Sequence, residues 1–300
     1  MDTRQLRCMV VLAEELSFSK AARRCNVTQP HLSRLIHELE AWVGTPLVVR
    51  ARGRREVELT PAGQAFVVRA RRVLGELSMA LEEAQAVSTG RALDLRIGLS
   101  NYGRLSPWQD IVNRLLARQP DARLKWHEMQ ASREHAEQLL AGQLDAAFIA
   151  PYGYEGRLAM QEVWQTNLVV LLPADHPLTA LTEVPLAALR ESLLYPVPPA
   201  LNLGLFDHIN RFTRSVGFEV QPAPSVIGYT NVQDKLHLVA LNGWVLLGLP
   251  DYLNELPVGV EARPIVNPTV PFAIVLAWDA FNHHPLLRHL IDTARTREVS

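Results

Sequence analysis

The chain has 300 residues, of which 48% are hydrophobic and 20% are charged, as in a soluble globular protein with two or three domains. It has no leader-like start and no apolar run near the ~20 residues of a membrane span, which predicts a cytoplasmic protein with no membrane partner. Two cysteines, Cys8 and Cys25, exclude a disulfide framework and a cysteine zinc site, and we expect buried thiols rather than redox sensors.

The net charge of −1 hides an asymmetry along the chain. Residues 1–72 contain 13 Lys and Arg against 7 Asp and Glu, whereas the remaining residues contain 17 against 24. A basic N-terminal unit on an acidic body suggests one domain that binds a polyanion and a second domain with a different task.

The first 44 residues have the pattern of three short helices. Apolar residues at helical spacing predict helices over 4–15, 18–24 with Ser17 as N-cap, and about 28–42 before Gly44. Ala21 and Ala22 would let the helices approach closely. The second and third helices, joined by a turn at Asn26-Val27, form a helix-turn-helix.

A basic hairpin and a long helix follow. The stretch "PLVVRARGRREVELT" predicts two short strands around Gly53, a wing placed to touch phosphates. Thr60 and Pro61 then begin a helix that continues to about Val87. Its apolar stripe predicts pairing with a second copy, the alternative being packing on its own C-terminal domain. The stripe consists of Phe66, Ala70, Val73, Leu77, Leu81, Ala84 and Val87.

From residue 93 strands alternate with helices, which predicts a parallel α/β sheet. The predicted strands are "LDLRIGLS", "ARLKWHEM", "GQLDAAFIA", "LVVLLPADHP", "WVLLGLP" and "PFAIVLAWD", with later helices around 206–216, 231–242 and 285–296. The body is therefore expected to form two α/β lobes joined by two crossings, near 162–167 and 265–271.

The N-terminal sequence "FSKAARRCNVTQPHLSRLIHELEAWVGTPLVVR" and the later "VELTPAG" closely resemble the DNA-binding domain of the LysR-type transcriptional regulators. The family's motifs fall on Thr28-Gln29-Pro30, Ser33-Arg34, Leu39-Glu40, Gly44, Pro46-Leu47, Arg50, Leu59-Thr60 and Gly63, with Val48 in place of the usual Phe and a longer wing. The body resembles the family's effector-binding domain. The resemblance implies an α/β protein with an N-terminal winged helix-turn-helix (1–60), a dimerisation helix (61–91) and a two-lobed domain like periplasmic binding proteins (92–300). Lobe I is expected at 92–163 and 269–300, and lobe II at 164–268.

The recognition helix of such a domain places its N-terminal residues at base edges in the major groove. Gln29 is suited to adenine and Arg34 to guanine. The alternative for His31 is a solvated side chain without a base contact. The predicted DNA-binding residues are Ser19, Lys20, Thr28, Gln29, Pro30, His31, Ser33, Arg34, Arg50, Arg52, Arg54 and Arg55. The partners are double-stranded DNA and a second copy paired through 61–88. The resemblance implies a tetramer, and RNA polymerase is a further candidate partner.

Between the lobes, helix N-termini would favour a small carboxylate effector. The predicted effector-binding residues are Ser100, Asn101, Ser132, Asn202 and Thr230, and plain helix capping is their alternative role. The loop "LLYPVPPALN" resembles that of muconate-responsive regulators of aromatic degradation. Those regulators carry an arginine where this chain has Ile149-Ala150, so another carboxylate or aromatic compound fits as well.

Two other classes of protein remain open. A solute-binding protein would need a leader and no helix-turn-helix, and a two-lobed α/β enzyme would need a catalytic constellation that the sequence does not show. We therefore expect no enzymatic activity, no catalytic residue, no metal and no cofactor.

Overall fold

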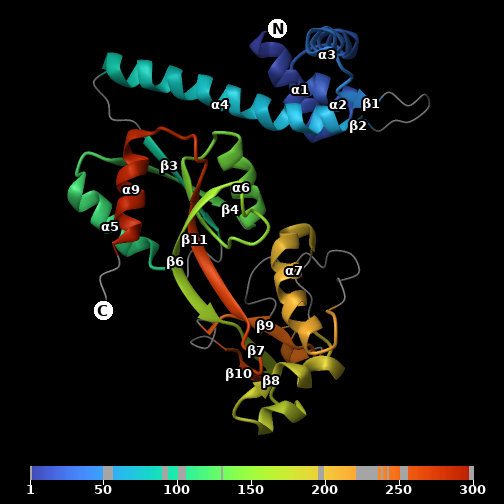
Figure 1. Cartoon of the computed structure of the whole chain (residues 1–300), viewed down its shortest axis with the longest axis vertical. Coiled ribbons are helices and arrows are strands. Elements are labelled where there is room, and N and C mark those ends of the chain that lie inside the picture. Colours follow the sequence, from blue (N-terminus) through green and yellow to red (C-terminus); the bar gives the residue numbers. More distant parts are fainter. Residues whose placement is uncertain are drawn as a thin grey trace. The chain divides into compact units, whose positions relative to one another are not determined.

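The computed structural model describes residues 2–49, 57–89, 94–100, 106–129, 131–194, 199–220, 236–250 without 238 and 242, and 256–296 (Figure 1). The chain divides into two compact units. One comprises Met1–Asp94 with Glu137–Leu144, and the other comprises Leu95–Ala136 with Asp145–Ser300.

The N-terminal unit begins with the three predicted helices. They are α1 (Thr3–Glu15), α2 (Phe18–Arg24) and α3 (Gln29–Val43). The turn between α2 and α3 places Asn26 in the left-handed region at φ 54°, which asparagine tolerates better than most residues. Gly44 ends α3 at φ 80°. The side chain of Ser17 accepts a hydrogen bond from the amide of Lys20, as its predicted role as N-cap requires.

An apolar core holds these helices together. Ala21 and Ala22 are fully or almost fully buried, which confirms the predicted close approach of α2. The other buried members are Cys8, Met9, Leu12, Leu32, Leu35, Ile36, Leu39, Leu47, Val48, Val57 and Val67. Burial raises the pKa of the Cys8 thiol to about 12, helped by its hydrogen bond with Cys25. Cys8 is buried as expected, whereas Cys25 is only partly buried.

A short wing and the long helix complete the unit. Strands β1 (Val48–Val49) and β2 (Glu58–Leu59) pair antiparallel, and α4 covers Pro61–Thr89. Thr60 caps α4: its hydroxyl accepts from the amide of Gly63 at 2.9 Å and donates to the carbonyl of Pro46 at 2.8 Å. Gly63 lies against the backbone of Leu47, where a Cβ would collide.

The α/β unit contains two sheets. The first has the order β4-β3-β5-β11-β6, and the second β8-β10-β7-β9. The strands of the first sheet are β3 (Asp94–Ser100), β4 (Arg123–Met129), β5 (Ala146–Ile149), β6 (Ala159–Asn167) and β11 (Pro271–Trp278). Those of the second are β7 (Val169–Pro173), β8 (Val184–Pro185), β9 (Leu246–Gly248) and β10 (Val260–Val266).

Helices pack against these sheets around an apolar core that includes Phe148, Leu172 and Phe272. They are α5 (Trp108–Arg118), α7 (Pro199–Ser215), α9 (Pro285–Arg295) and the 3₁₀ helices η2 (Pro177–Ala180) and η3 (Leu186–Glu191). Helix α6 (Ser132–Leu140) is divided between the two units, since its residues from Glu137 onward belong to the first. Of the predicted helix 231–242, residues 236–237 and 239–241 are helical in the part that the structure describes.

The sheets are mixed, which corrects the prediction of a parallel sheet. Strands β3 and β5 are parallel, but β11 runs antiparallel to both β5 and β6, and β7 runs antiparallel to β10 and β9. The first crossing between the lobes, expected near 162–167, lies within a strand that the sequence analysis did not predict. This strand, β6, runs to Asn167, and β7 begins at Val169. The amide of Leu168 between them donates to the carbonyl of Val270 at 2.8 Å, so the two crossings lie side by side.

Within the described ranges, no helix is both long and apolar enough to cross a membrane. The same ranges hold no group of three or more His, Cys, Asp or Glu side chains placed to bind a metal ion.

Candidate functional site

The N-terminal end of α3 presents polar side chains to solvent over a buried apolar face. Leu32, Leu35, Ile36 and Leu39 are buried in the core, as the periodicity predicts. The exposed or half-buried residues at the same end are Thr28, Gln29, Pro30, His31, Ser33 and Arg34. Pro30 is in the first turn, where its missing N–H costs no helical hydrogen bond. This end of α3 is therefore free to enter a groove.

The start of α2 lies beside this end of α3. Ser19 and Lys20 are exposed, and the hydroxyl of Ser19 donates to Oε1 of Gln29 at 3.0 Å. Two residues predicted for different tasks, a backbone contact and a base contact, thus form one polar patch. The predicted wing residues Arg50, Arg52, Arg54 and Arg55 lie outside the described residues.

Two carboxylates of α3 have roles that were not predicted from the sequence. Oε1 of Glu40 accepts from the amides of Leu47 and Val48 at 2.9 and 3.1 Å, which ties the base of the wing to α3. Oε1 of Glu38 accepts from Nε of Arg34 at 2.9 Å. The spacing of four residues between Arg34 and Glu38 is the signal that could have revealed the second contact.

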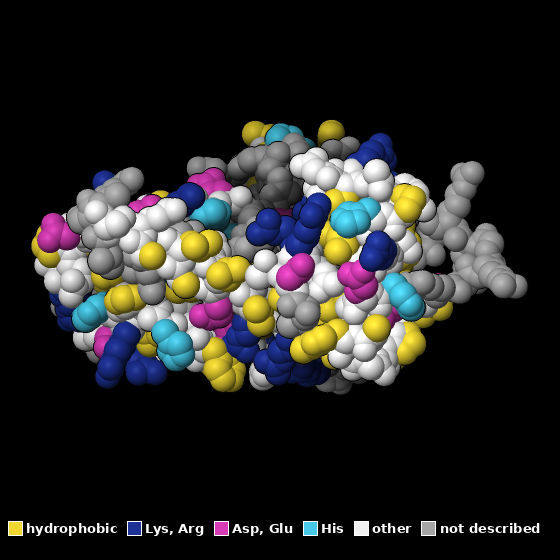
Figure 2. Space-filling model, turned by 90° about the horizontal axis from the view of Figure 1, so that it is seen from above, with side chains coloured by type: hydrophobic (Ala, Val, Ile, Leu, Met, Phe, Trp, Pro, Cys, Tyr) yellow, Lys and Arg dark blue, Asp and Glu magenta, His cyan; other side chains and the backbone are white. Residues whose placement is uncertain are grey.

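Along α4 the predicted apolar stripe is only partly buried. Phe66 and Ala70 pack within their own unit, whereas Val73, Leu77 and Leu81 are 51%, 39% and 58% exposed. Exposed hydrophobic side chains also lie between basic ones on the face of the molecule drawn in Figure 2. The open part of the stripe is an apolar surface that the described residues of this chain do not cover.

In the α/β unit, two of the predicted effector residues meet at the carboxyl end of β5. Ser100, the last residue of β3, is buried, and its hydroxyl donates to the carbonyl of Phe148 at 3.0 Å. Ser132, also buried, begins α6, and its Oγ accepts from the amide of Ala150 at 3.2 Å. Because that bond uses an oxygen lone pair, the hydroxyl hydrogen of Ser132 can still point to a ligand.

A buried histidine supports the segment that leads to Ser132. The two ring nitrogens of His135 lie 3.1 Å from the carbonyl oxygen of Ala131 and 3.2 Å from that of His127. The side chain therefore connects the end of β4 to the start of α6, and this connection places Ser132 next to β5.

The loop after β5 meets α7 at a close backbone contact. A Cβ at Gly204 would collide with the backbone of Tyr152, so glycine lets the helix reach this loop. The ring of Tyr152 stacks on His208 of α7 with centroids 4.1 Å apart, and the tyrosine hydroxyl accepts from the amide of Ala273 at 3.0 Å. Burial raises the pKa of Tyr152 to about 12, so the hydroxyl stays protonated.

The other predicted effector residues are less fully described. Asn202 belongs to the first turns of α7, but its side chain is outside the described residues, as are Asn101 and Thr230 entirely. The structure thus places Ser100, Ser132 and the start of α7 around the end of β5. A pocket of about 510 Å³ between α5 and β4, lined in part by Trp108, Leu124 and Trp126, includes none of the five predicted residues.

Two family descriptions match the chain. Residues 3–64 match "Bacterial regulatory helix-turn-helix protein, lysR family", and residues 88–298 match "LysR substrate binding domain". Together they cover both units that carry the candidate sites.

Named relatives align with most or all of the chain. The "HTH-type transcriptional regulator AlsR" of Bacillus subtilis is 29% identical over 301 residues, covering 100% of this chain and 97% of that protein. The "Hca operon transcriptional activator HcaR" of Escherichia coli is 29% identical over 303 residues, covering 100% and 99%. The "HTH-type transcriptional regulator CatR" of Pseudomonas putida is 34% identical over 215 residues, covering 69% and 72%.

Solved structures share the fold along the whole chain. A full-length OxyR variant from Pseudomonas aeruginosa matches with a TM-score of 0.59 at 26% identity, covering 100% of this chain and 96% of that one. Full-length CbnR complexed with its target DNA matches with a TM-score of 0.54 at 23% identity, covering 98% and 99%. At that identity the second likeness concerns the fold alone.

Proposed function

The chain belongs to the LysR family of DNA-binding transcriptional regulators, and from this membership we propose how it binds DNA and what controls the binding. It is a regulator with an effector-binding domain and not an enzyme, since its relatives are named transcriptional regulators. The rival interpretations, a transporter's solute-binding protein and a two-lobed enzyme, have no use for the matched helix-turn-helix. We place its action in the cytoplasm, where its DNA partner is.

We propose that α3 reads an operator through Gln29 and Arg34. Thr28, Pro30, His31 and Ser33 would lie at bases or phosphates, and Ser19, Lys20 and the wing arginines on the backbone. The observation that carries the proposal is the division of α3 into an exposed polar N-terminal end and a buried apolar face. The proposed DNA-binding domain is 1–60, followed by the pairing helix 61–91.

Binding to the intergenic DNA beside the gene tests this role. Arg34→Ala is expected to lose about 1–3 kcal/mol of sequence-specific binding free energy at fixed salt. Fluorescence anisotropy with labelled intergenic duplex and a scrambled duplex measures it. Equal affinity of both proteins for the intergenic duplex would contradict a base-reading role for Arg34.

We propose further that a small carboxylate binds between lobe I (92–163 and 269–300) and lobe II (164–268). The hydroxyl hydrogen of Ser132 at the end of β5 and the N-termini of α6 and α7 supply donors suited to such a group. Ser100, whose own hydroxyl hydrogen goes to the carbonyl of Phe148, lies beside them and can only accept. Asn101, Asn202 and Thr230 complete the proposed set. Binding would change DNA affinity only through a difference in effector affinity between two states of the domain.

Thermal unfolding in the presence of small carboxylates tests this site. Aromatic carboxylates and muconate come first, because the sequence of segment 193–202 resembles that of muconate-responsive regulators. A ligand at 100 times its Kd stabilises the folded protein by about 2.7 kcal/mol, which raises the melting temperature. Ser132→Ala is expected to reduce that rise, while the unliganded melting temperature stays within a few degrees. A rise of the same size in Ser132→Ala would remove Ser132 from the site.

Two copies are proposed to pair through the exposed part of α4, since a two-fold dimer places two α3 helices on two half-sites. A tetramer and contact with RNA polymerase are further expectations from the family resemblance.

A further inference from the structure

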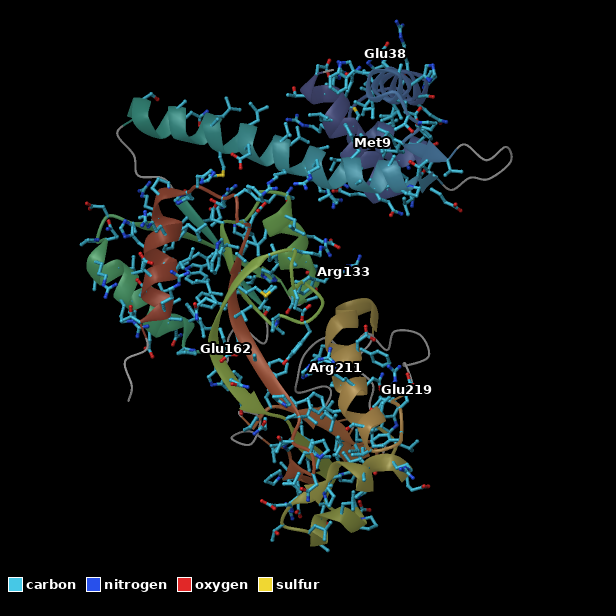
Figure 3. All side chains as sticks on the ribbon, in the orientation of Figure 1. Met9, Glu38, Arg133, Glu162, Arg211 and Glu219 are labelled. Carbon is cyan, nitrogen blue, oxygen red and sulfur yellow. The ribbon has the colours of Figure 1, made fainter. Side chains whose placement is uncertain are left out.

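Glu38 stands between the predicted base-reading arginine and the first helix of the domain. Its Oε1 accepts from Nε of Arg34 at 2.9 Å, and its Oε2 accepts from Nε2 of Gln5 at 3.2 Å. Figure 3 shows Glu38 on α3. The carboxylate of Glu38 therefore accepts one hydrogen bond from α3, through Arg34, and one from α1, through Gln5.

Gln5 is itself held in place. The side-chain Oε1 of Gln5 accepts from the backbone N–H of Asp2 at 3.0 Å. The backbone N–H of Gln5 donates to Oδ1 of Asp2 at 2.8 Å, and the two hydrogen bonds form a capping box at the start of α1. Gln5 is only 8% exposed. The side-chain amide of Gln5 has one orientation here, because its Oε1 can only accept and its Nε2 can only donate. Oε1 faces the backbone N–H of Asp2, and Nε2 faces the carboxylate of Glu38. Gln5 is thus a fixed support for Glu38.

The contact with Glu38 uses the Nε edge of the Arg34 guanidinium. The side chain of Arg34 is 78% exposed, and within the described part of the chain its two terminal Nη groups have no recorded partner. Those groups form the edge that donates bidentately to O6 and N7 of guanine. A long, exposed arginine otherwise loses rotamer freedom when it binds.

We propose that Glu38, backed by Gln5, is a positioning residue that holds Arg34 with its Nη edge ready for a base. The proposal rests on the proposed role of α3 in reading DNA. Glu38 also brings a negative charge close to the phosphates, which weakens binding to any sequence. Orienting the base reader while weakening non-specific binding raises the ratio of specific to non-specific affinity, the quantity that matters for a regulator.

Glu38→Gln separates the two contributions. A glutamine has an NH2 group in place of one carboxylate oxygen, and whichever way its amide is turned, that NH2 group faces the donor of either Arg34 or Gln5. The matched control is Glu183→Gln, which removes the same charge from an exposed position outside both α3 and α4. Gln5→Met, of similar volume, removes the support without changing the charge.

The experiment uses the full chain and a pool of randomised duplexes. Selection with the wild type defines the preferred site, and anisotropy then measures affinity for that duplex, for single-base variants and for an unrelated duplex. We expect Glu38→Gln to lower discrimination at one base pair per half-site by about 3-fold or more, part of the about 5- to 150-fold that a bidentate contact carries. Affinity for the unrelated duplex is expected to stay equal or rise.

Arg34→Ala is expected to lose the preference at the same base pair, and adding Glu38→Gln to it should have no further effect there. Gln5→Met should weaken the same preference, and Glu183→Gln should leave it intact. If Glu38→Gln leaves every base preference unchanged, or strengthens binding to all duplexes equally, Glu38 acts through its charge alone and the positioning role is overturned. A wild type that enriches no sequence overturns the reading of DNA by α3 as well.

Discussion

At the scale of single residues, Asp145 is the fully buried charge that ties the α/β unit together. Its carboxylate accepts from the backbone amide, Nε and an Nη group of Arg96 at 2.8 to 3.0 Å, and from Asn282 at 2.9 Å. Burial raises the pKa of this carboxyl, but the hydrogen bonds and charge of Arg96 outweigh burial and hold the pKa below its ordinary value. The contact joins β3, the start of β5 and the segment before α9.

Asp145→Asn is expected to destabilise the protein by about 3–5 kcal/mol, since it leaves the buried Arg96 without its counter-charge. The folded-state pKa of Asp145 lies below the unfolded value of about 3.9, so its contribution is present above that pH and is lost as the pH falls through the folded-state value. Urea unfolding of both proteins at pH 7 and pH 3.5 measures this. The difference in stability should be smaller at pH 3.5, and a constant difference would show that charge is not the cause.

The side-chain contacts that the sequence could not predict join residues that are far apart along the chain. Arg96 and Asn282 contact Asp145 only because three segments meet in the fold. Gln5 reaches Glu38 for the same reason. By contrast, the candidate DNA-reading residues from Thr28 to Arg34 lie on one helix, so helical spacing alone placed them on one exposed end.

At the scale of elements, the docking of α7 depends on a neutral histidine. Nε2 of His208 lies 2.7 Å from the carbonyl oxygen of Pro271 at the start of β11, and its ring also meets Phe212 edge-on. Burial lowers the pKa of His208, and nearby Arg211 lowers it further, against opposing effects of the Pro271 carbonyl and Glu155. The neutral ring donates from Nε2 to Pro271.

Because the folded-state pKa of His208 lies below the unfolded value of about 6.5, unfolding takes up a proton near that pH. The stability that depends on His208 is therefore complete above about pH 6.5 and falls as the pH drops through that value. His208→Gln retains a donor without a titrating group. The urea midpoint should fall more between pH 8 and pH 5.5 in the wild type than in His208→Gln. An equal fall in both proteins would exclude this contribution of His208.

The strands show which elements the sequence could predict. β3, β5, β7 and β11 were predicted because they are nearly continuous runs of buried apolar residues. β6 lacks such a run, since Val163 is its one buried residue and the rest of "AMQEVWQTN" is partly or fully exposed. The mixed direction of the sheet escaped prediction because strand order depends on pairing between distant segments, such as β5 with β11.

At the scale of the whole molecule, the exposed part of α4 is where a second copy is proposed to bind. Val73, Leu77 and Leu81 recur every four residues on one face, and burying them against an identical helix would remove their apolar surface from water. The prediction from sequence placed the pairing stripe from Phe66 onward, but Phe66 packs inside its own unit.

Changing Val73, Leu77 and Leu81 together to lysine is expected to yield a folded monomer with much weaker binding to a duplex that carries two half-sites. Size-exclusion chromatography with light scattering measures the mass, and circular dichroism checks the fold. Val68→Lys, at another exposed apolar position of α4, is the control and should leave the mass unchanged. A triple variant that keeps the mass of the wild type would move the interface elsewhere.

The paired crossings of the α/β unit constrain how its halves could be exchanged. Asn167 opposes Pro271 in one sheet and Val169 opposes Pro264 in the other, with Leu168 bonded to Val270 between them. One residue added to a single crossing would turn every later side chain of that strand to the opposite face of its sheet. A chimaeric regulator that takes its second lobe from a relative must therefore match the length of both crossings at once. A lobe of the effector domain can therefore be exchanged only with two junctions, one in each crossing, that both keep the original number of residues.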